Sequence, residues 1–389
     1  MEKTAKFISR AFCAAIAMTA MLISYYYAAL PVNISMDISD EFPDGGFSAA
    51  VLRPLGEGAG YYVGAVPIKS AETESVERPH LIPCGTPFGI KMRSDGVIVA
   101  SVAEGSPAED CGLKQGDVIT SINGFAVRTN AEVADAIAHS GGECEILLSR
   151  GSSELSLSCT PSTEDGVPRI GAWVRDSAAG IGTLTFYDPE SGRFGGLGHA
   201  VSDTATGEPV PLYSGEITEA DIYDVIKGEC GAAGELCGVL HPNSSEGTVS
   251  ANTRVGVFGT LNTPVEGEAL PVAFRQEVEC GDAVILATIN GRVPQEYSIK
   301  IERINLLDIN GSKGMLIKVT DERLLDAAGG IVCGMSGSPI IQNGMLVGAV
   351  THVLINNPTK GYAVFAESMT EMMETCGELA ETSGVSPAA

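Results

Sequence analysis

An uncharged stretch of twenty residues, 11–30, constrains the start of this chain more than any other feature. Twenty helical residues span about 30 Å, which is the thickness of the hydrocarbon core of a bilayer. Lys6 and Arg10 precede the stretch, and the tyrosine run 25–27 lies near its far end, as interfacial aromatic residues do. We predict an uncleaved transmembrane anchor at residues 1–31, with the rest of the chain outside the cytoplasm. The alternative is a cleaved signal peptide, whose apolar core is usually shorter.

The composition favours turn-rich β structure beyond the anchor. The 389 residues include 47 glycines and only 6% aromatic residues, and this length predicts two folded domains or three. The 49 acidic and 24 basic residues give a net charge of −25, which repels phosphate backbones, so we expect no nucleic-acid partner. The ten cysteines contain no CxxC pair and no zinc-type cluster, so no metal or cofactor is expected. Free buried thiols are the simplest expectation for them, and one or two disulfides are the alternative.

The segment 106–124 predicts the beginning of a small folded unit. Ser106 can cap a short helix that begins at Pro107, and Gly112 suits the left-handed end of that helix. A strand at 118–122 follows, and then an Asn-Gly pair that favours a tight hairpin. The order helix, strand and hairpin indicates a compact unit of mixed α and β structure.

A second helix at about 130–139 has one apolar face and extends this unit. The chain from 80 to 161 resembles a PDZ domain of the kind found in bacterial proteases, most specifically in the run SPAEDCGLKQGDVITSING. The resemblance implies that Phe88, Gly89 and Ile90 belong to the loop whose backbone N–H groups receive a peptide C-terminus. The alternative is a PDZ domain that only packs against its neighbour and binds no ligand.

The Gly-rich block 329–341 carries the strongest candidate for catalysis. A nucleophilic serine needs a tight turn that presents its hydroxyl and frees nearby backbone N–H groups. Ser336 stands between Gly334 and Gly337 in such a segment, and an apolar hairpin follows, as in the nucleophile region of chymotrypsin-like peptidases. We expect Ser336 as the nucleophile, Ser338 as the fallback, and the N–H groups of Gly334 and Ser336 as an oxyanion hole. The alternative is that this segment only leads into an ordinary β-hairpin and has no catalytic role.

Only histidines suit the role of general base, because an imidazole titrates in the range that serine activation requires. The chain has five of them: His80, His139, His199, His241 and His352. His199 lies in the segment Gly-Leu-Gly-His-Ala-Val-Ser-Asp, where glycines allow close backbone approach. We therefore expect His199 as the base and His352 as the alternative.

A carboxylate normally orients such a base, and the residues alone leave several candidates open. These are Asp203, Asp282, Asp308, Asp321 and Asp326. The anchor, the PDZ-like unit, the segment around His199 and the block 317–353 together resemble the stage IV sporulation protein B peptidase family. The resemblance implies His199 as base, Asp321 as orienting carboxylate and Ser336 as nucleophile. Asp321 lies 336 − 321 = 15 residues before Ser336, closer than is usual in chymotrypsin-like enzymes, which implies a divergent barrel.

The resemblance also implies an architecture and a biological role. The expected fold is mainly β: an α+β PDZ domain at 80–161, then a divergent chymotrypsin-like β-barrel serine peptidase domain at 162–380, with a linker at 32–79 and a flexible tail at 381–389. The implied protein is a membrane-anchored serine endopeptidase of sporulation signalling, located between forespore and mother cell. It would cleave itself, in the exposed stretch 32–80, and cleave a membrane-bound regulator of an intramembrane metalloprotease, which leads to sigma-factor activation. The alternatives are a non-enzymatic anchored PDZ adaptor and a general extracytoplasmic quality-control protease.

Overall fold

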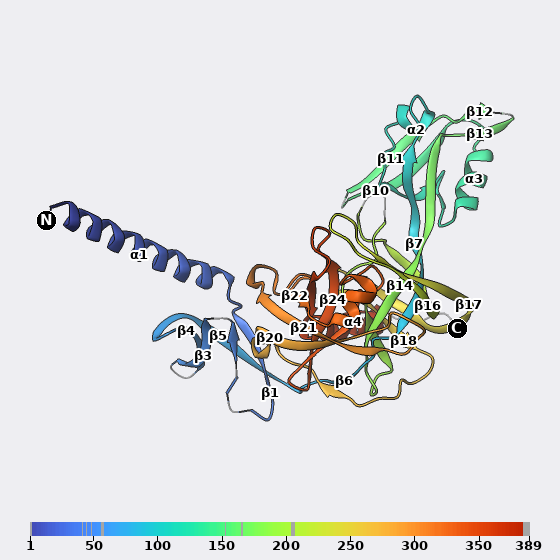
Figure 1. Cartoon of the computed structure of the whole chain (residues 1–389). Helices are drawn as coiled ribbons and strands as arrows, with labels where there is room; N and C mark the ends of the chain where they lie inside the picture. Colours follow the sequence, from blue (N-terminus) through green and yellow to red (C-terminus); the bar gives the residue numbers. More distant parts are fainter. Residues whose placement is uncertain are drawn as a thin grey trace.

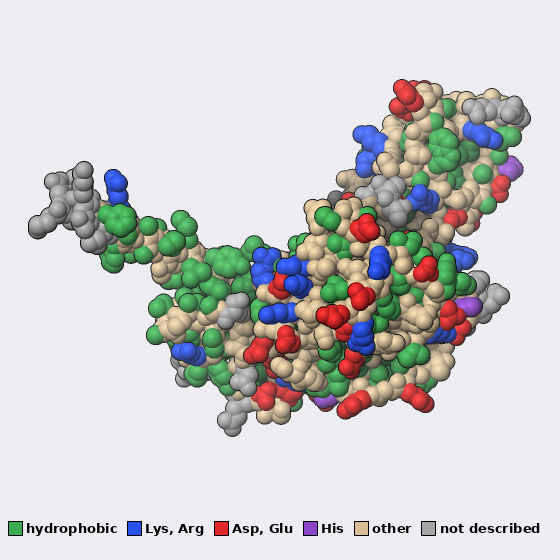
Figure 2. Space-filling model, viewed as in Figure 1, with side chains coloured by type: hydrophobic (Ala, Val, Ile, Leu, Met, Phe, Trp, Pro, Cys, Tyr) green, Lys and Arg blue, Asp and Glu red, His purple; other side chains and the backbone are tan. Residues whose placement is uncertain are grey.

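The computed structural model shows a mainly β protein with a long N-terminal helix (Figure 1). It describes residues 2–40, 42–43, 45–47, 49–55, 58–151, 153–164, 166–203 and 207–383. Helix α1 (Glu2–Ala29) projects from the body, and hydrophobic side chains cover much of its visible surface (Figure 2). Its segment Arg10–Ala29 is long and apolar enough to cross a membrane, and only 6% of it is buried. A signal sequence near an N-terminus would meet the same criterion.

A small five-stranded sheet follows α1, where the sequence predicts a linker. Its strands are β1 (Asn33–Asp37), β2 (Gly46–Phe47), β3 (Ala50–Leu55), β4 (Gly58–Val63) and β5 (Val66–Val76), in the order β1-β5-β4-β3-β2. The polar stretch that suggested a linker lies in β5, where Ile68 and Ala71 are buried and the acidic residues are exposed. The linker prediction is therefore wrong here. A strand that is buried on only one face contains few apolar residues, so its sequence resembles that of a polar linker.

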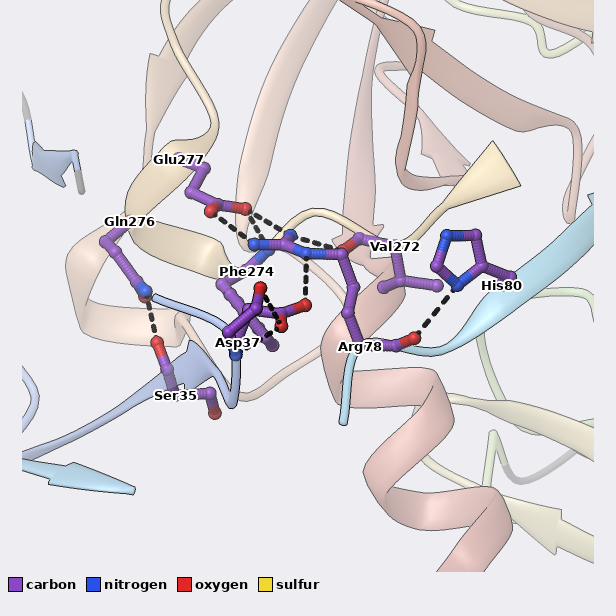
Figure 3. Close-up of polar contacts among 9 residues, drawn as sticks. Ser35, Asp37, Arg78, His80, Val272, Phe274, Gln276 and Glu277 are labelled. Carbon is purple, nitrogen blue, oxygen red and sulfur yellow. Dashed lines mark hydrogen bonds and ion pairs between the residues drawn. The ribbon is translucent and has the colours of Figure 1, made fainter. Parts of the chain in front are cut away.

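Figure 3 shows how this N-terminal sheet is joined to the rest of the molecule. The Arg78 guanidinium forms ion pairs with Asp37 at 3.2 Å and with Glu277 at 2.8 Å, and it lies 4.2 Å from the ring centre of Phe274. Gln276 Nε2 donates to the carbonyl oxygen of Ser35 at 2.6 Å. Both ion pairs are largely shielded from solvent, and removing one partner of such a pair costs about 3 kcal/mol. The sheet is thus a docked module.

A sheet of twelve strands forms the centre of the molecule, and two of its strands run through two modules (Figure 1). The strands are β6 (His80–Pro83), β7 (Pro87–Val102), β8 (Val118–Ile122), β9 (Phe125–Ala126), β10 (Cys144–Arg150), β11 (Ser153–Cys159), β14 (Ala172–Tyr187), β15 (Arg193–Gly196), β16 (Leu212–Ile226), β17 (Glu235–Thr253), β18 (Gly256–Leu261) and β19 (Leu270–Pro271). Strands β7 and β14 are antiparallel partners from Pro87↔Thr183 to Val102↔Ala172. A separate hairpin contains β12 (Ser162–Glu164) and β13 (Val167–Arg169).

The PDZ module occupies the far half of these two long strands and has its own helices. Helix α2 (Pro107–Asp110) is capped by Ser106, and α3 (Asn130–Ala138) begins with a capping box of Thr129 and Glu132. Both helices lie where the sequence predicts them, because caps and turns act locally. The Asn-Gly hairpin is also confirmed, with a positive φ of 52° at Asn123.

Two separate hydrophobic cores show where the PDZ module begins and ends. One core gathers residues of the module, among them Val99, Ile119 and Ile146, together with the start of β14. The other core contains Phe88 and Phe194 with residues of β6 and β14–β18, and we call these strands with the adjoining half of β7 the first lobe. The PDZ module is therefore inserted between β7 and β14, and the predicted PDZ start at residue 80 falls within the first lobe.

The second lobe is a closed barrel with the strand order β20-β21-β22-β25-β24-β23. These strands are β20 (Gly281–Ala287), β21 (Gln295–Ile304), β22 (Met315–Val319), β23 (Pro339–Gln342), β24 (Met345–Val353) and β25 (Lys360–Phe365). Its helices are η1 (Arg275–Glu277), η2 (Leu306–Asp308), α4 (Glu322–Ala328) and α5 (Ala366–Ser383). Helix α5 packs on β24 and β25, with Met369 and Met373 buried. A PDZ module and two β lobes agree with the predicted mainly β class.

All ten cysteines are free thiols. Cys84, Cys144 and Cys159 are buried, and burial raises the pKa of the Cys84 thiol to about 12, which makes it unreactive as a nucleophile. Four other cysteines are exposed, so the expectation of buried thiols holds for only part of the set: Cys13, Cys230, Cys280 and Cys333.

Candidate active site

Ser336 lies in the loop that joins α4 to β23, and glycines determine the shape of this loop. Gly334 and Gly337 both have φ of +97°, a conformation that other residues rarely adopt. A Cβ on Gly337 would lie 2.0 Å from the carbonyl oxygen of Thr183, so the loop packs directly against β14 of the first lobe. Ser338 is fully buried (0% exposed), which excludes the fallback nucleophile from contact with substrate.

Hydrogen bonds from both lobes hold this nucleophile loop. Thr183 of β14 donates from its backbone N–H to the carbonyl oxygen of Ser336 at 2.9 Å, and from Oγ1 to that of Gly334 at 2.8 Å. From the second lobe, the carbonyl oxygen of Val350 accepts the N–H of Gly337 at 2.7 Å. The serine therefore sits at the junction of the two lobes.

His199 reaches the same junction from the first lobe. It follows β15 through a turn in which Leu197 and Gly198 have φ of +66° and +67°. A Cβ on Gly198 would lie 2.8 Å from Cγ2 of Thr351, so the turn packs against β24. The imidazole of His199 lies 5.0 Å from that of His352, between ring centres.

The Ser336 hydroxyl points to the backbone that carries one of these imidazoles. Ser336 Oγ donates to the carbonyl oxygen of Thr351 at 2.7 Å, and Thr351 directly precedes His352. The structure brings the expected base and the alternative base together, and the expected nucleophile contacts the residue that precedes the alternative base. The remaining histidines have other partners: His80 binds Arg78 O, His139 binds Asp135 O, and His241 pairs with Asp221.

The hydrogen bond of His199 defines its tautomer. Nδ1 lies 2.8 Å from the carbonyl oxygen of Ala200, which can only accept, so Nδ1 carries the proton and Nε2 is the free base. Burial lowers the pKa of His199, which keeps the ring neutral at pH 7. Burial, together with repulsion from His199 and Lys313, lowers the pKa of His352 to about 4. Both rings are neutral, as a general base must be.

Asp321 lies at the N-terminus of α4, away from His199. Its carboxylate accepts from the backbone N–H groups of Arg323 at 3.0 Å and Ser298 at 3.2 Å, and it pairs with the Arg323 guanidinium at 2.8 Å. Arg323 lowers the pKa of Asp321 to about 2. The ladder aligns His352 with Tyr362 and Tyr362 with Leu316, and Asp321 lies five residues beyond Leu316, roughly 16 Å at about 3.3 Å per residue. The structure does not bring Asp321 to His199.

The other candidate carboxylates also have their own roles. Asp203 pairs with Arg175 at 3.4 Å, and Asp308 accepts from the N–H of Lys313 at 2.9 Å. Asp282 lies on β20 and Asp326 on α4. Among the residues that the structure describes, the polar partner of the His199 ring is the backbone of Ala200.

Sequence reasoning missed Asn252, which fixes the segment after His199. Its Oδ1 accepts from the N–H of Val201 at 2.8 Å, and its Nδ2 donates to the carbonyl oxygens of Val201 and Val210, each at 2.9 Å. No motif marks Asn252, because it acts on backbone groups that are distant in sequence. It is a positioning residue for the His199 loop.

Two backbone N–H groups at and beside Ser336 are free to bind another group. Among the described residues, neither the N–H of Gly334 nor that of Ser336 has an acceptor. The N–H groups of their neighbours are all occupied: Cys333 donates to Gly234 O, Met335 to Val332 O, Gly337 to Val350 O and Ser338 to Met335 O. Two free donors on either side of Met335 can hold one negatively charged oxygen.

The predicted peptide-binding loop of the PDZ module is wrong. Phe88, Gly89 and Ile90 lie in β7, between β14 on one side and β16 on the other, so their backbone groups are paired on both edges. Phe88 is 2% exposed and lies 6.4 Å from the ring of Phe194. An apolar run of this kind also suits a strand that is buried on both faces, which is what it forms.

A model of the SpoIVB peptidase S55 family matches residues 166–370, just over half of the chain, and this region includes His199, Asp321 and Ser336. The chain belongs to the SpoIVB peptidase S55 family. A PDZ-domain model matches residues 98–150, which excludes Phe88–Ile90 as the structure does. The family resemblance drawn from the sequence is confirmed.

Other similarities cover smaller parts of this S55 member. Serine protease HTRA1 of Xenopus tropicalis is 37% identical over 68 residues, which are 18% of this chain and 15% of that protein. Serine protease HTRA2 of Drosophila persimilis is 38% identical over 82 residues, 19% of each chain. The chain thus spans less than a fifth of the length of these relatives.

Two solved structures are also similar to parts of this chain. The PDZ domain of an SdrC-like protein from Listeria monocytogenes is 32% identical, with 21% of this chain and 87% of that chain covered and a TM-score of 0.19. A protease from M. tuberculosis in its active form is 15% identical, with 55% and 78% covered and a TM-score of 0.30.

Proposed function

We propose that this S55 family member is a serine endopeptidase with Ser336 as nucleophile and His199 as general base. One observation supports the proposal: the nucleophile loop, with the Ser336 hydroxyl and two free backbone N–H groups, and the His199 turn both pack against Thr351 and His352 where the two lobes join. The nucleophile loop supplies the hydroxyl and the N–H groups, the first lobe supplies the imidazole, and serine peptidase chemistry needs all of these groups.

The proposed reaction begins with a rotation of the Ser336 side chain from Thr351 O toward Nε2 of His199. Nε2 takes the hydroxyl proton as Oγ bonds to the carbonyl carbon of the scissile peptide. The N–H groups of Gly334 and Ser336 then hold the negatively charged oxygen. The imidazolium returns its proton to the leaving amine, and a water molecule, activated by the same ring, hydrolyses the acyl-enzyme.

The role of Asp321 follows from its contacts. It caps α4, and α4 ends at Gly329, where the nucleophile block begins, so Asp321 acts on the site through this helix. Asp321→Ala is expected to lower the free energy of unfolding by about 1 kcal/mol, because it removes the cap, whereas Asp321→Asn keeps an acceptor and most of the stability. Thermal denaturation measures both variants.

The peptidase activity of the asparagine variant is the decisive readout for Asp321. Activity close to that of the unmodified protein would show that Asp321 acts only as the cap of α4. A loss on the order of 10⁴-fold at native stability would show that Asp321 reaches His199 during catalysis, against the described geometry.

The cellular role is part of the same proposal. The apolar helix α1 supports an anchor with the body outside the cytoplasm, and family membership supports sporulation signalling between forespore and mother cell. The substrates would be the protein itself and a membrane-bound regulator of an intramembrane metalloprotease. Most of the proposed self-cleavage region, 32–80, is folded into strands, so cleavage would fall in their connections, of which positions 41, 44, 48, 56 and 57 lie outside the described residues.

The PDZ module adds a surface for a peptide strand. The start of β14, Ala172–Arg175, pairs with β7 on one edge, and α3 packs beside it. A peptide would add to the other edge of β14, as in strand addition to PDZ domains. Protection of the amide protons of residues 172–176 from exchange by an added peptide would support this site, and unchanged exchange with peptide bound would exclude it.

The test of the proposed function is labelling with a fluorophosphonate, which reacts only with an activated serine. We expect one adduct per chain, located by mass spectrometry on the peptide that contains Ser336, and none in the Ser336→Ala variant. An anchored PDZ adaptor without peptidase activity would not react. Equal labelling of both proteins would place the reactive serine elsewhere.

A further inference from the structure

The hairpin between β16 and β17 reaches out of the first lobe and contacts the loop that leads to Ser336. Four backbone hydrogen bonds fix it there: Gly228 N–H to Ala328 O at 2.9 Å, Gly231 N–H to Ile355 O at 2.9 Å, Cys333 N–H to Gly234 O at 2.8 Å, and Leu236 N–H to Cys333 O at 2.9 Å. Glu235 and Cys333 also form a parallel bridge. We call residues 227–236 the bracing hairpin.

The last of these bonds determines the direction of one peptide group. In a planar trans peptide, the carbonyl of Cys333 and the N–H of Gly334 point in opposite directions. Leu236 N–H holds the Cys333 oxygen on the side of the bracing hairpin. The Gly334 N–H therefore points away from the hairpin, and among the described residues it has no acceptor.

A reversed peptide would be disfavoured by the same contacts. Rotation would turn the Gly334 N–H toward the Leu236 N–H, so that two donors face each other and the Leu236 group loses its acceptor. A buried N–H group without its acceptor is disfavoured, so the observed orientation of the peptide should dominate. Gly334 itself, at φ of +97°, is a residue whose backbone can adopt either orientation.

The side chain of Leu236 supports the same arrangement. It is 3% exposed, and a Cβ placed on Gly334 would lie 3.0 Å from its Cβ and 3.1 Å from its Cδ1. Leu236 therefore fills the space directly behind Gly334. The hairpin is itself held firmly, because Val225 pairs with Leu236 and β16 pairs with β7.

We infer that the bracing hairpin is the positioning element of the oxyanion hole, and that Leu236 keeps the Gly334 N–H directed at the substrate. The inference rests on the proposed peptidase function. It makes Leu236 a positioning residue that never touches substrate. A shift of this hairpin would switch catalysis off while Ser336 and His199 stay in place.

The test compares substitutions at Leu236 in the full chain, with a decapeptide that the unmodified protein cleaves, selected from a synthetic library. Leu236→Pro removes the N–H, and we expect kcat to fall on the order of 100-fold, as for loss of one oxyanion donor, with KM changed less than threefold. Leu236→Met keeps both the N–H and the side-chain volume, and its kcat is expected to lie within threefold of that of the unmodified protein. Cys237→Ala, the next position along β17, is the matched control and should match the unmodified protein.

Leu236→Ala covers the case in which the proline variant does not fold, since it keeps the N–H and removes only the packing behind Gly334. We expect about a tenfold lower kcat and an unchanged KM. The inference is overturned if Leu236→Pro folds and has native kcat. If Leu236→Pro does not fold, a folded Leu236→Ala protein with native kcat overturns it. If the unmodified protein neither cleaves the library nor reacts with a fluorophosphonate, the proposed function itself fails.

Discussion

Ser336→Ala is expected to abolish peptidase activity, with kcat/KM lowered on the order of 10⁵-fold or more. The variant loses the only atom that can form the acyl-enzyme, while the loop should keep its shape. That shape depends on Gly334, Gly337 and the bonds from Thr183, not on the serine side chain. Self-cleavage of the purified full chain in detergent and cleavage of library peptides both measure the effect.

Ser202→Ala is the matched control for this loss, because Ser202 lies outside the nucleophile loop, and it should retain activity. The melting temperature of Ser336→Ala should stay within a few degrees of that of the unmodified protein. A Ser336→Ala protein that still cleaves itself at the normal rate would contradict the assignment of the nucleophile.

The second large effect is expected for His199. His199→Ala should lower kcat on the order of 10⁴-fold, because no other base would then accept the serine proton. His352→Gln, only 5.0 Å away between ring centres, should lower it less than tenfold, since we place that ring beside the base and not in the proton transfer. The reverse order of effects would make His352 the base.

The pH dependence of kcat/KM adds an independent check on His199. Protonated His199 cannot accept a proton, so activity should fall as the pH drops through its pKa and stay level above it. Burial lowers this pKa, so the midpoint should lie below the ordinary value of 6.5. A midpoint above 6.5 would indicate a carboxylate beside the ring, because a negative neighbour raises the pKa of an imidazole.

The parts of the fold that local chemistry controls could be predicted from the sequence. Ser106 signals the start of α2, and the Asn-Gly pair at 123–124 signals a hairpin, because caps and turns involve neighbouring residues. The glycines around Ser336 could be interpreted in the same way, since each allows a backbone angle or a close approach that other residues do not.

The errors concern contacts between distant segments. Phe88–Ile90 matches a PDZ loop in local pattern, but its partners are β14 and β16, 90 or more residues away. Asp321 is an exception: its role is predicted from a resemblance, whereas its partner in the fold, Arg323, is only two residues away. The contact between Leu236 and Cys333 uses backbone atoms alone, so no side-chain pattern in the sequence predicts it.

A crystal structure of the peptidyl-phosphonate adduct is the most direct test of the account. We predict phosphorus bonded to Oγ of Ser336, with one phosphonate oxygen within about 3 Å of the N–H groups of both Gly334 and Ser336, and Nε2 of His199 within hydrogen-bond distance of Oγ. An adduct on another residue, or His199 turned away from Ser336 in the adduct, would contradict the assignment of the active site to the junction of the two lobes.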